Sequence, residues 1–128
     1  MRFMMMVKGD KDYEAGLPSV PELIEAINKL SEDMTRAGVM VDNGGLMPSV
    51  TGARVRASQG KVSVTDGPFT ETKELIGGYA IVEAGSRHEA IELGKQFMAL
   101  HVSVLGDVYD GECEVRQMYE GPDCHPAR

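Results

Sequence analysis

The chain has 128 residues, which is enough for one domain and too few for two. Its apolar share of 42% and its charged share of 26% are ordinary for a globular domain, and they exclude a collagen-like, a disordered and a coiled-coil chain. The 13 basic and 20 acidic residues give a net charge of −7, so phosphate backbones and anionic membranes would repel the molecule, and we expect neither direct contact with nucleic acid nor a membrane partner.

The chain opens with a strand and a helix. Residues 1–7 form an apolar run in which alternate side chains face opposite ways, so this strand needs cover on both faces and belongs at the centre of a sheet. Ser19 and Glu22 have the spacing of a capping box, which predicts a helix that ends at Gly38 in a left-handed stop. The predicted buried stripe of this helix is Leu23, Ile27, Leu30, Met34 and Ala37.

A short strand and a hairpin follow the first helix. The strand covers 39–41 and ends in a turn over 42–45, which the side-chain acceptors and two glycines there favour. The hairpin pairs 53–58 with 61–65 across the two-residue turn Gln59–Gly60. One of its faces carries valines and the other carries polar side chains, so we expect a half-solvated hairpin.

The second half of the chain repeats the strand and helix pattern. A loop over 66–76 leads into a strand over 79–84 that is apolar on both sides, apart from one glutamate. Ser86 opens a second capping box, and the helix that it starts is expected to end near His101. The last strand, over 112–119, alternates and has one wetter face.

The order of the predicted elements indicates an α+β fold. The two strands that need cover on both faces are those that precede the two helices, as in a ferredoxin-like split β-α-β arrangement, where they lie side by side in an antiparallel sheet. Both helices then cover one face, and the inserted β-hairpin covers at most part of the other, so we expect a homodimer packed sheet to sheet. The single domain spans residues 1–120, and residues 121–128 form a C-terminal tail.

The compartment is predicted from what the sequence lacks. No apolar stretch approaches the ~20 residues that span a bilayer, and the opening residues lack a signal-peptide pattern. Cys113 and Cys124 have neither C-x-x-C spacing nor the density of a secreted disulfide scaffold. We therefore expect a cytoplasmic protein with free thiols.

The densest polar segment begins at Asp66 and separates the hairpin from the next strand. In a structural interpretation it is a turn, in which Asp66 accepts backbone amides, Pro68 fixes its own φ and Phe69 anchors the loop. In a functional interpretation Asp66, Glu71 and Lys73 lie at the mouth of a cleft, where burial and opposite charge tune a general base or bind a polar ligand. The sequence leaves both interpretations open.

Three motifs lie close together here: Asp66-Gly67-Pro68-Phe69, Glu71-Thr72-Lys73-Glu74 and Gly77-Gly78-Tyr79. In residue type and spacing they resemble the YCII-related family, in the subgroup named for its D-G-P-F motif, and both ends of the chain agree with that pattern. The resemblance implies a dimeric α/β barrel of ferredoxin-like subunits. Some relatives resemble small-molecule lyases or dehydrohalogenases that rely on a His/Asp pair, and others are joined to, or act beside, sigma factors of the extracytoplasmic-function type.

The candidate acid–base pair differs from that of the short-chain relatives. Their proposed catalytic histidine lies in the first helix, whereas residues 21–38 of this chain contain none. A catalytic pair would therefore be Asp66 with His101, although a helix-end histidine favoured by the helix dipole is the plainer interpretation of His101. The residues expected to contact a ligand are Glu71, Lys73, Tyr79 and Arg54.

We expect no metal and no cofactor, because the histidines lack metal-ligand spacing and the glycine pairs fit no nucleotide-binding loop. The first hypothesis is an enzyme that transfers a proton on a small molecule, with Asp66 as base or orienting group. The second is a non-catalytic regulatory or ligand-binding dimer that works with a sigma factor. The third is a dimeric scaffold in which the D-G-P-F motif has only a structural role.

Overall fold

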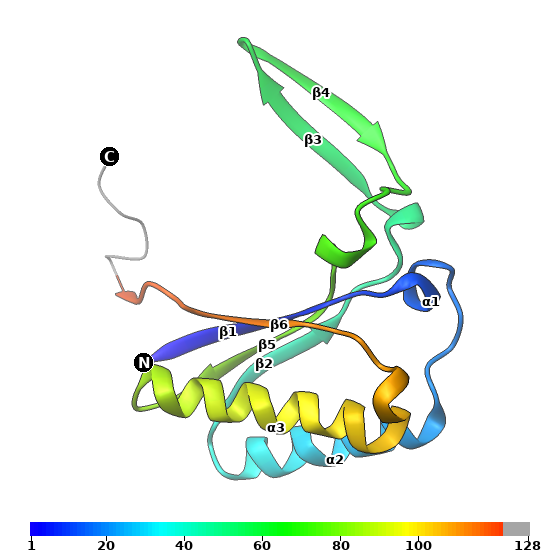
Figure 1. Ribbon diagram of the computed structural model, residues 1–128. Coiled ribbons are helices and arrows are strands. Elements are labelled where there is room, and N and C mark those ends of the chain that lie inside the picture. The colour runs from blue at the N-terminus through cyan, green and yellow to red at the C-terminus, as the bar shows by residue number, and fades with distance from the viewer. Residues whose placement is uncertain (122–128) are drawn as a thin grey trace.

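The computed structural model describes residues 1–121, so nearly all of the predicted C-terminal tail, including Cys124, lies outside the described residues. Within these described residues there are three α-helices and six strands, with short 3-10 helices between them (Figure 1). In chain order the elements are β1 Arg2–Lys8, α1 Lys11–Glu14, α2 Pro21–Arg36, β2 Met40–Gly45, η1 Ser49–Thr51, β3 Ala53–Ser58, β4 Lys61–Asp66, η2 Thr72–Glu74, β5 Ile76–Glu83, α3 Arg87–Leu105, η3 Gly106–Val108 and β6 Cys113–Gln117.

The main layer is an antiparallel four-stranded sheet in the order β2-β5-β1-β6. The two long helices, α2 and α3, lie together on one face of this sheet (Figure 1). The prediction that β1 and β5 are the central strands is confirmed, since each pairs with a strand on both sides. The α+β class is confirmed as well, in the form of antiparallel sheets combined with helices.

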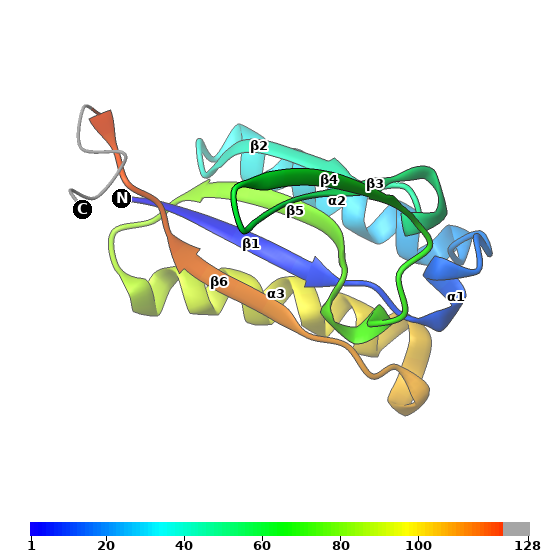
Figure 2. The same ribbon diagram turned by 90° about the horizontal axis from the view of Figure 1, so that it is seen from above.

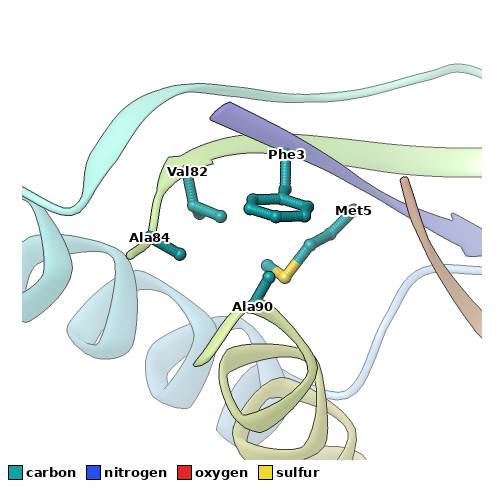
Figure 3. Close-up of a cluster of buried hydrophobic side chains, with 5 residues drawn as sticks. All are labelled: Phe3, Met5, Val82, Ala84 and Ala90. Carbon is teal, nitrogen blue, oxygen red and sulfur yellow. The ribbon is translucent and has the colours of Figure 1, made fainter. Parts of the chain in front are cut away.

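The core lies between the central strands and α3. Phe3 and Met5 of β1 and Val82 of β5 are almost fully buried and meet Ala90 of α3 (Figure 3). A second small residue of α3, Gly94, is also buried, and a Cβ there would lie 3.2 Å from a methyl group of Val115. Small side chains on α3 therefore let this helix lie close to the sheet.

None of the helices within residues 1–121 covers the opposite face of the sheet (Figure 1). Side chains alternate along a strand, so the neighbours of the core residues point away from α2 and α3. Met4 pairs with Ile81 and Met6 pairs with Tyr79 on this side, and all four residues are partly exposed. The central strands are thus apolar on both faces, as the sequence predicts.

The capping box predicted at Ser19 is wrong. Helix α2 starts at Pro21, its N-cap is Val20, and no side chain caps it. Proline has no backbone N–H and its fixed φ suits the first helical position, so the helix starts there without a hydroxyl cap. Gly38, at φ +74°, ends the helix as predicted. Of the predicted stripe, Ala37 is exposed because it occupies the C-cap.

Strand β2 is longer than predicted, and the turn predicted at residues 42–45 is wrong. These residues continue β2 and pair with β5, after an irregularity between Met40 and Asp42. Gly44 faces the ring of Tyr79, where an added Cβ would lie 3.0 Å from Cε1. The local turn preference is therefore overridden by hydrogen bonds to β5, and the missing side chain makes room for the tyrosine.

Strands β3 and β4 form a separate two-stranded sheet that projects from the body, on the side away from α2 and α3 (Figure 1). The predicted register is confirmed, because Val55 pairs with Val64 across a turn in which Gln59 and Gly60 both have positive φ. The predicted half-burial is wrong: both faces are exposed, and Val62 is 72% exposed. The hairpin leaves the main sheet, so no described element covers its valines. Seen from above, it overlies β5 and β2 (Figure 2).

The Ser86 cap of α3 is confirmed, since its hydroxyl accepts from the amide of Glu89 at 3.2 Å. The helix continues to Leu105, one turn beyond the end predicted near His101. No glycine or proline interrupts residues 102–105, so the helix can continue, and Gly106 then ends it at positive φ. Within residues 1–121, no helix combines the length and the apolar character that crossing a bilayer requires.

Candidate functional site

A cavity of about 530 Å³ lies between the four-stranded sheet and the helices. Its volume falls within the range of about 300–1,000 Å³ that is common for small-molecule sites. Strands β1, β2 and β5 supply its floor, and α1, α2 and α3 supply its walls. Its apolar lining residues include Met5, Leu23, Ile27, Met34, Ala80 and Phe97.

The cavity arises from the way α2 packs on the sheet. Leu23 and Met34, near the two ends of the helix, are buried. Ile27 and Leu30, between them, are only partly buried, and all four residues line the cavity. The apolar stripe of α2 is therefore buried near its two ends, and its middle residues are less buried and face the cavity.

His101 is the most buried polar residue of the lining and the only buried polar residue within 1–121, at 7% exposure. Its Nδ1 lies 3.1 Å from the carbonyl oxygen of Phe97. A carbonyl oxygen only accepts, so Nδ1 carries a proton and donates it, and neutral His101 has its lone pair on Nε2. Nε2 has no hydrogen-bond partner among the described residues.

Aromatic rings fix the orientation of the His101 imidazole. The Phe97 ring meets it edge-on at a centroid distance of 4.9 Å, and the Tyr109 ring stacks on it at 5.0 Å. Both rings also line the cavity. The imidazole is therefore held between two rings and one backbone carbonyl, which restricts both its position and its tautomer.

Three tyrosines belong to the cavity lining, and two of them, Tyr109 and Tyr13, have raised pKa values. Burial raises the pKa of Tyr109, and the carboxylate of Asp10 adds to this shift. Burial likewise raises the pKa of Tyr13, whose hydroxyl is enclosed and has no hydrogen-bond partner among the described residues. Both phenols therefore keep their protons at neutral pH and remain hydrogen-bond donors.

The structure does not bring Asp66 and His101 together. Asp66 is the exposed last residue of β4, at the base of the hairpin, and it does not line the cavity. His101 lies in α3, buried beside the sheet. Of the residues expected to contact a ligand, only Tyr79 belongs to the cavity lining, and the alternation of β5 directs its side chain to the face of the sheet opposite α2 and α3.

Arg54 and Glu71 contact each other at the surface. The Arg54 Nη2 atom lies 3.2 Å from Glu71 Oε2, and the guanidinium stacks 3.9 Å above the ring of Phe69. The backbone N–H of Glu71 itself and the Arg54 guanidinium lower the pKa of the Glu71 carboxyl. Lys73 lies exposed in η2. Arg54 and Glu71 therefore pair with each other, Lys73 is exposed to solvent, and none of the three lines the cavity.

The D-G-P-F segment contacts the 3-10 helix η1 and, through it, helix α1. A Cβ on Gly67 would overlap the carbonyl oxygen of Ser49. The amide of Phe69 donates to Ser49 Oγ at 3.0 Å. Ser49 in turn donates its hydroxyl and its amide to the Glu14 carboxylate, at 2.5 and 2.9 Å.

Sequence reasoning missed Tyr13, Tyr109, Glu14 and Ser49. All four lie between the predicted strands and helices, where no periodicity indicates which side chains point inward. Two tyrosines within otherwise polar, glycine-containing segments are the signal that was available, because a large aromatic ring there commonly packs inward.

Metal ligation finds no support in the part of the chain that the structure describes, where no group of three His, Cys, Asp or Glu side chains is placed to hold an ion. Cys113 is a free cysteine on β6, half-buried, and burial raises the pKa of its thiol. The thiol is therefore mostly protonated at neutral pH, which makes it a poor nucleophile.

Residues 1–100 match the family model of the YCII-related domain. An uncharacterized protein of Rhizobium meliloti (strain 1021) is 28% identical over 92 residues, which cover 72% of this chain and 69% of the relative. The family match includes the D-G-P-F segment, α1, α2 and most of α3. It ends just before His101, so the match itself assigns nothing to that side chain.

Proposed function

Because the chain belongs to the YCII-related family, we propose that it binds a small molecule in the cavity between sheet and helices and transfers a proton at His101. The observation that carries this proposal is the buried imidazole of His101, whose Nδ1 is occupied by Phe97 while Nε2 is free among the described residues. A general base needs such a lone pair within reach of a bound substrate.

The lining indicates the class of ligand. The walls are mainly aliphatic and aromatic, with Met5, Ile27 and Phe97 among them, so most of the ligand should be apolar. Its polar part should carry a proton that Nε2 can accept, beside the phenol of Tyr109 as a donor. A compact molecule with a weakly acidic C–H bond, such as an enolisable ketone, has this combination.

We also propose that the chain belongs to the D-G-P-F subgroup and that its subunit is ferredoxin-like and forms a dimeric barrel. The strand order β2-β5-β1-β6, with both long helices on one face, supports the subunit fold. The partly exposed Met4, Met6 and Ile81 on the other face support a sheet-to-sheet dimer. A cytoplasmic location and an association with a sigma factor stay predictions.

A metabolite screen tests the proposed site. A ligand at about 100 times its dissociation constant stabilises the fold by roughly 2.7 kcal/mol, which a thermal-shift assay detects. We expect hits whose stabilisation is lost in His101→Gln and kept in His88→Gln, because His88 is exposed in the first turn of α3. Hits that bind both variants equally would overturn the role of His101.

The same hits separate catalysis from binding. Each is incubated with the wild-type protein in deuterated water and then analysed by mass spectrometry, because proton transfer at carbon introduces deuterium. Incorporation that disappears in His101→Gln supports an enzyme. A ligand that binds in the cavity and is recovered without deuterium supports the non-catalytic ligand-binding alternative.

A further inference from the structure

The D-G-P-F segment lies outside the cavity, yet a continuous set of contacts joins it to one wall. We propose that this segment positions α1, through Ser49 and Glu14, and thereby holds Tyr13 at the end of the cavity. The proposal rests on the proposed function, since it gives the motif a role at the same site. Residues of the motif act here as positioning residues and touch no ligand.

The first contact is between Gly67 and η1. The missing side chain of Gly67 lets its backbone lie against the carbonyl of Ser49, where a Cβ would overlap the oxygen. The Gly67 amide donates to the carbonyl oxygen of Gly52 at 2.9 Å, just after η1. The motif is thus fixed to η1 on both sides of that short helix.

The second contact passes from η1 to α1. Ser49 Oγ accepts the Phe69 amide and donates to the Glu14 carboxylate, so one hydroxyl joins the motif to α1. The Ser49 amide donates to the other carboxylate oxygen. Ser49 and Glu14 are partly buried, and hydrogen bonds to a carboxylate are stronger there than at an exposed site.

The third contact places Tyr13 in the wall. Helix α1 has only four residues, so it cannot be stable from its own hydrogen bonds and depends on Asp10 at its N-cap and Glu14 at its end. The Tyr13 ring packs on the backbones of Gly9 and Gly77, where added Cβ atoms would lie 2.9 and 3.5 Å from ring atoms. Losing the Glu14 contact should therefore loosen the wall that Tyr13 forms.

The test removes one hydroxyl in the middle of this set of contacts. In Ser49→Ala we expect amide hydrogen exchange in α1, measured by NMR, to accelerate roughly tenfold or more, since hydrogen bonds to charged groups are the stronger ones. We expect exchange in β1 and β5 to stay as in the wild type. Ser49→Thr, which keeps a hydroxyl, should restore protection.

The matched control is Thr51→Ala, in the same 3-10 helix, whose hydroxyl bonds only the local carbonyl of Pro48. It should leave exchange in α1 unchanged. If Ser49→Ala is unfolded, Glu14→Gln tests the same contact from α1. Unchanged exchange in α1 for the folded variant, or equal acceleration in Thr51→Ala, would overturn the proposal.

Binding of 8-anilinonaphthalene-1-sulfonate links the motif to the cavity. We expect the wild type to bind this probe with NMR shift changes at cavity residues. Ser49→Ala should bind the probe about threefold more weakly or worse, because a looser wall must be ordered on binding. Thr51→Ala should bind it as the wild type does. Equal affinity in all three proteins would overturn the positioning role. A wild-type protein that binds no probe in the cavity would count against the proposed function instead, while the exchange data still decide whether the motif holds α1.

Discussion

The Nδ1 atom of His101 lies 3.1 Å from the carbonyl oxygen of Phe97, one helical turn earlier in α3. This contact holds Nδ1 against the helix backbone and directs Nε2 away from the backbone. The stacked ring of Tyr109 keeps that arrangement in place. A histidine in an apolar surrounding is thereby given one defined tautomer.

The first prediction concerns this tautomer. We expect nitrogen-15 NMR to show that the neutral imidazole of His101 is protonated at Nδ1. The neutral imidazole of exposed His88 should favour protonation at Nε2, as free imidazole side chains do. His101→Gln identifies the resonance. A His101 signal protonated at Nε2 would contradict the contact with Phe97 and the assignment of Nε2 as a base.

The second prediction concerns Gly67. An added methyl group would overlap the Ser49 carbonyl, and the obstacle is backbone rather than a flexible side chain. We expect Gly67→Ala to lower the free energy of unfolding by about 1–3 kcal/mol, as overpacking commonly does. Gly45→Ala is the control, because no atom lies within 4 Å of the added Cβ, and it should change stability by less than about 0.5 kcal/mol. Equal urea midpoints for the two variants would contradict the close approach.

The third prediction is a pH dependence at Glu83. Arg2 Nε donates to Glu83 at 2.6 Å, and Arg2 together with the N-terminal ammonium lowers the pKa of this carboxyl. A carboxyl with a lowered pKa in the folded state stabilises the fold above the ordinary glutamate pKa of about 4.3, and this contribution is lost as the pH falls through the lowered value. The stability difference between wild type and Glu83→Gln should therefore be larger near about pH 7 than near about pH 3.

Urea denaturation at several pH values measures that difference. The pair is exposed, so the effect is small and should shrink further in high salt. Glu32→Gln serves as the control, because this exposed carboxylate has no ion pair among the described residues. A difference for Glu83→Gln that does not change with pH would contradict the contribution assigned to Arg2.

The fourth prediction concerns the open face of the main sheet. We expect the wild type to sediment as a dimer at micromolar concentration and Ile81→Glu to sediment as a monomer, because a charge there would be buried without a partner. Val102→Glu is the control, since Val102 is an apolar residue that is 55% exposed on α3. A wild-type monomer, or a dimer that survives Ile81→Glu, would refute sheet-to-sheet assembly.

Much of the fold could be predicted because its signals are local. The alternation in residues 1–7 indicated a central strand that is apolar on both faces, and Gln59–Gly60 set the register of the hairpin. The turn expected at residues 42–45 failed because pairing with β5, far away in sequence, overrides a local preference. The prediction that one face of the hairpin is buried was wrong for a similar reason. Alternation shows which side chains share a face, but it does not show whether another element covers that face.

The candidate site was harder to predict than the fold. His101 was identified, but its surroundings depend on a helix that continues to Leu105 and on a tyrosine that follows η3. The cavity lies along the α2 stripe, whose middle residues are less buried than those near its ends, and a repeat of apolar residues does not reveal such differences in packing. The link from Gly67 to Glu14 joins segments about 50 residues apart in sequence through Ser49, and no pattern within either segment indicates it.

The projecting hairpin of β3 and β4 contributes no side chain to the hydrophobic core, because both its faces are exposed. Its tip is the tight turn at Gln59–Gly60. A chain break or an extra loop at this tip would remove no buried contact. The tip is consequently a site where a fluorophore, an affinity tag or a whole inserted domain can be attached while the cavity and the four-stranded sheet keep their shape.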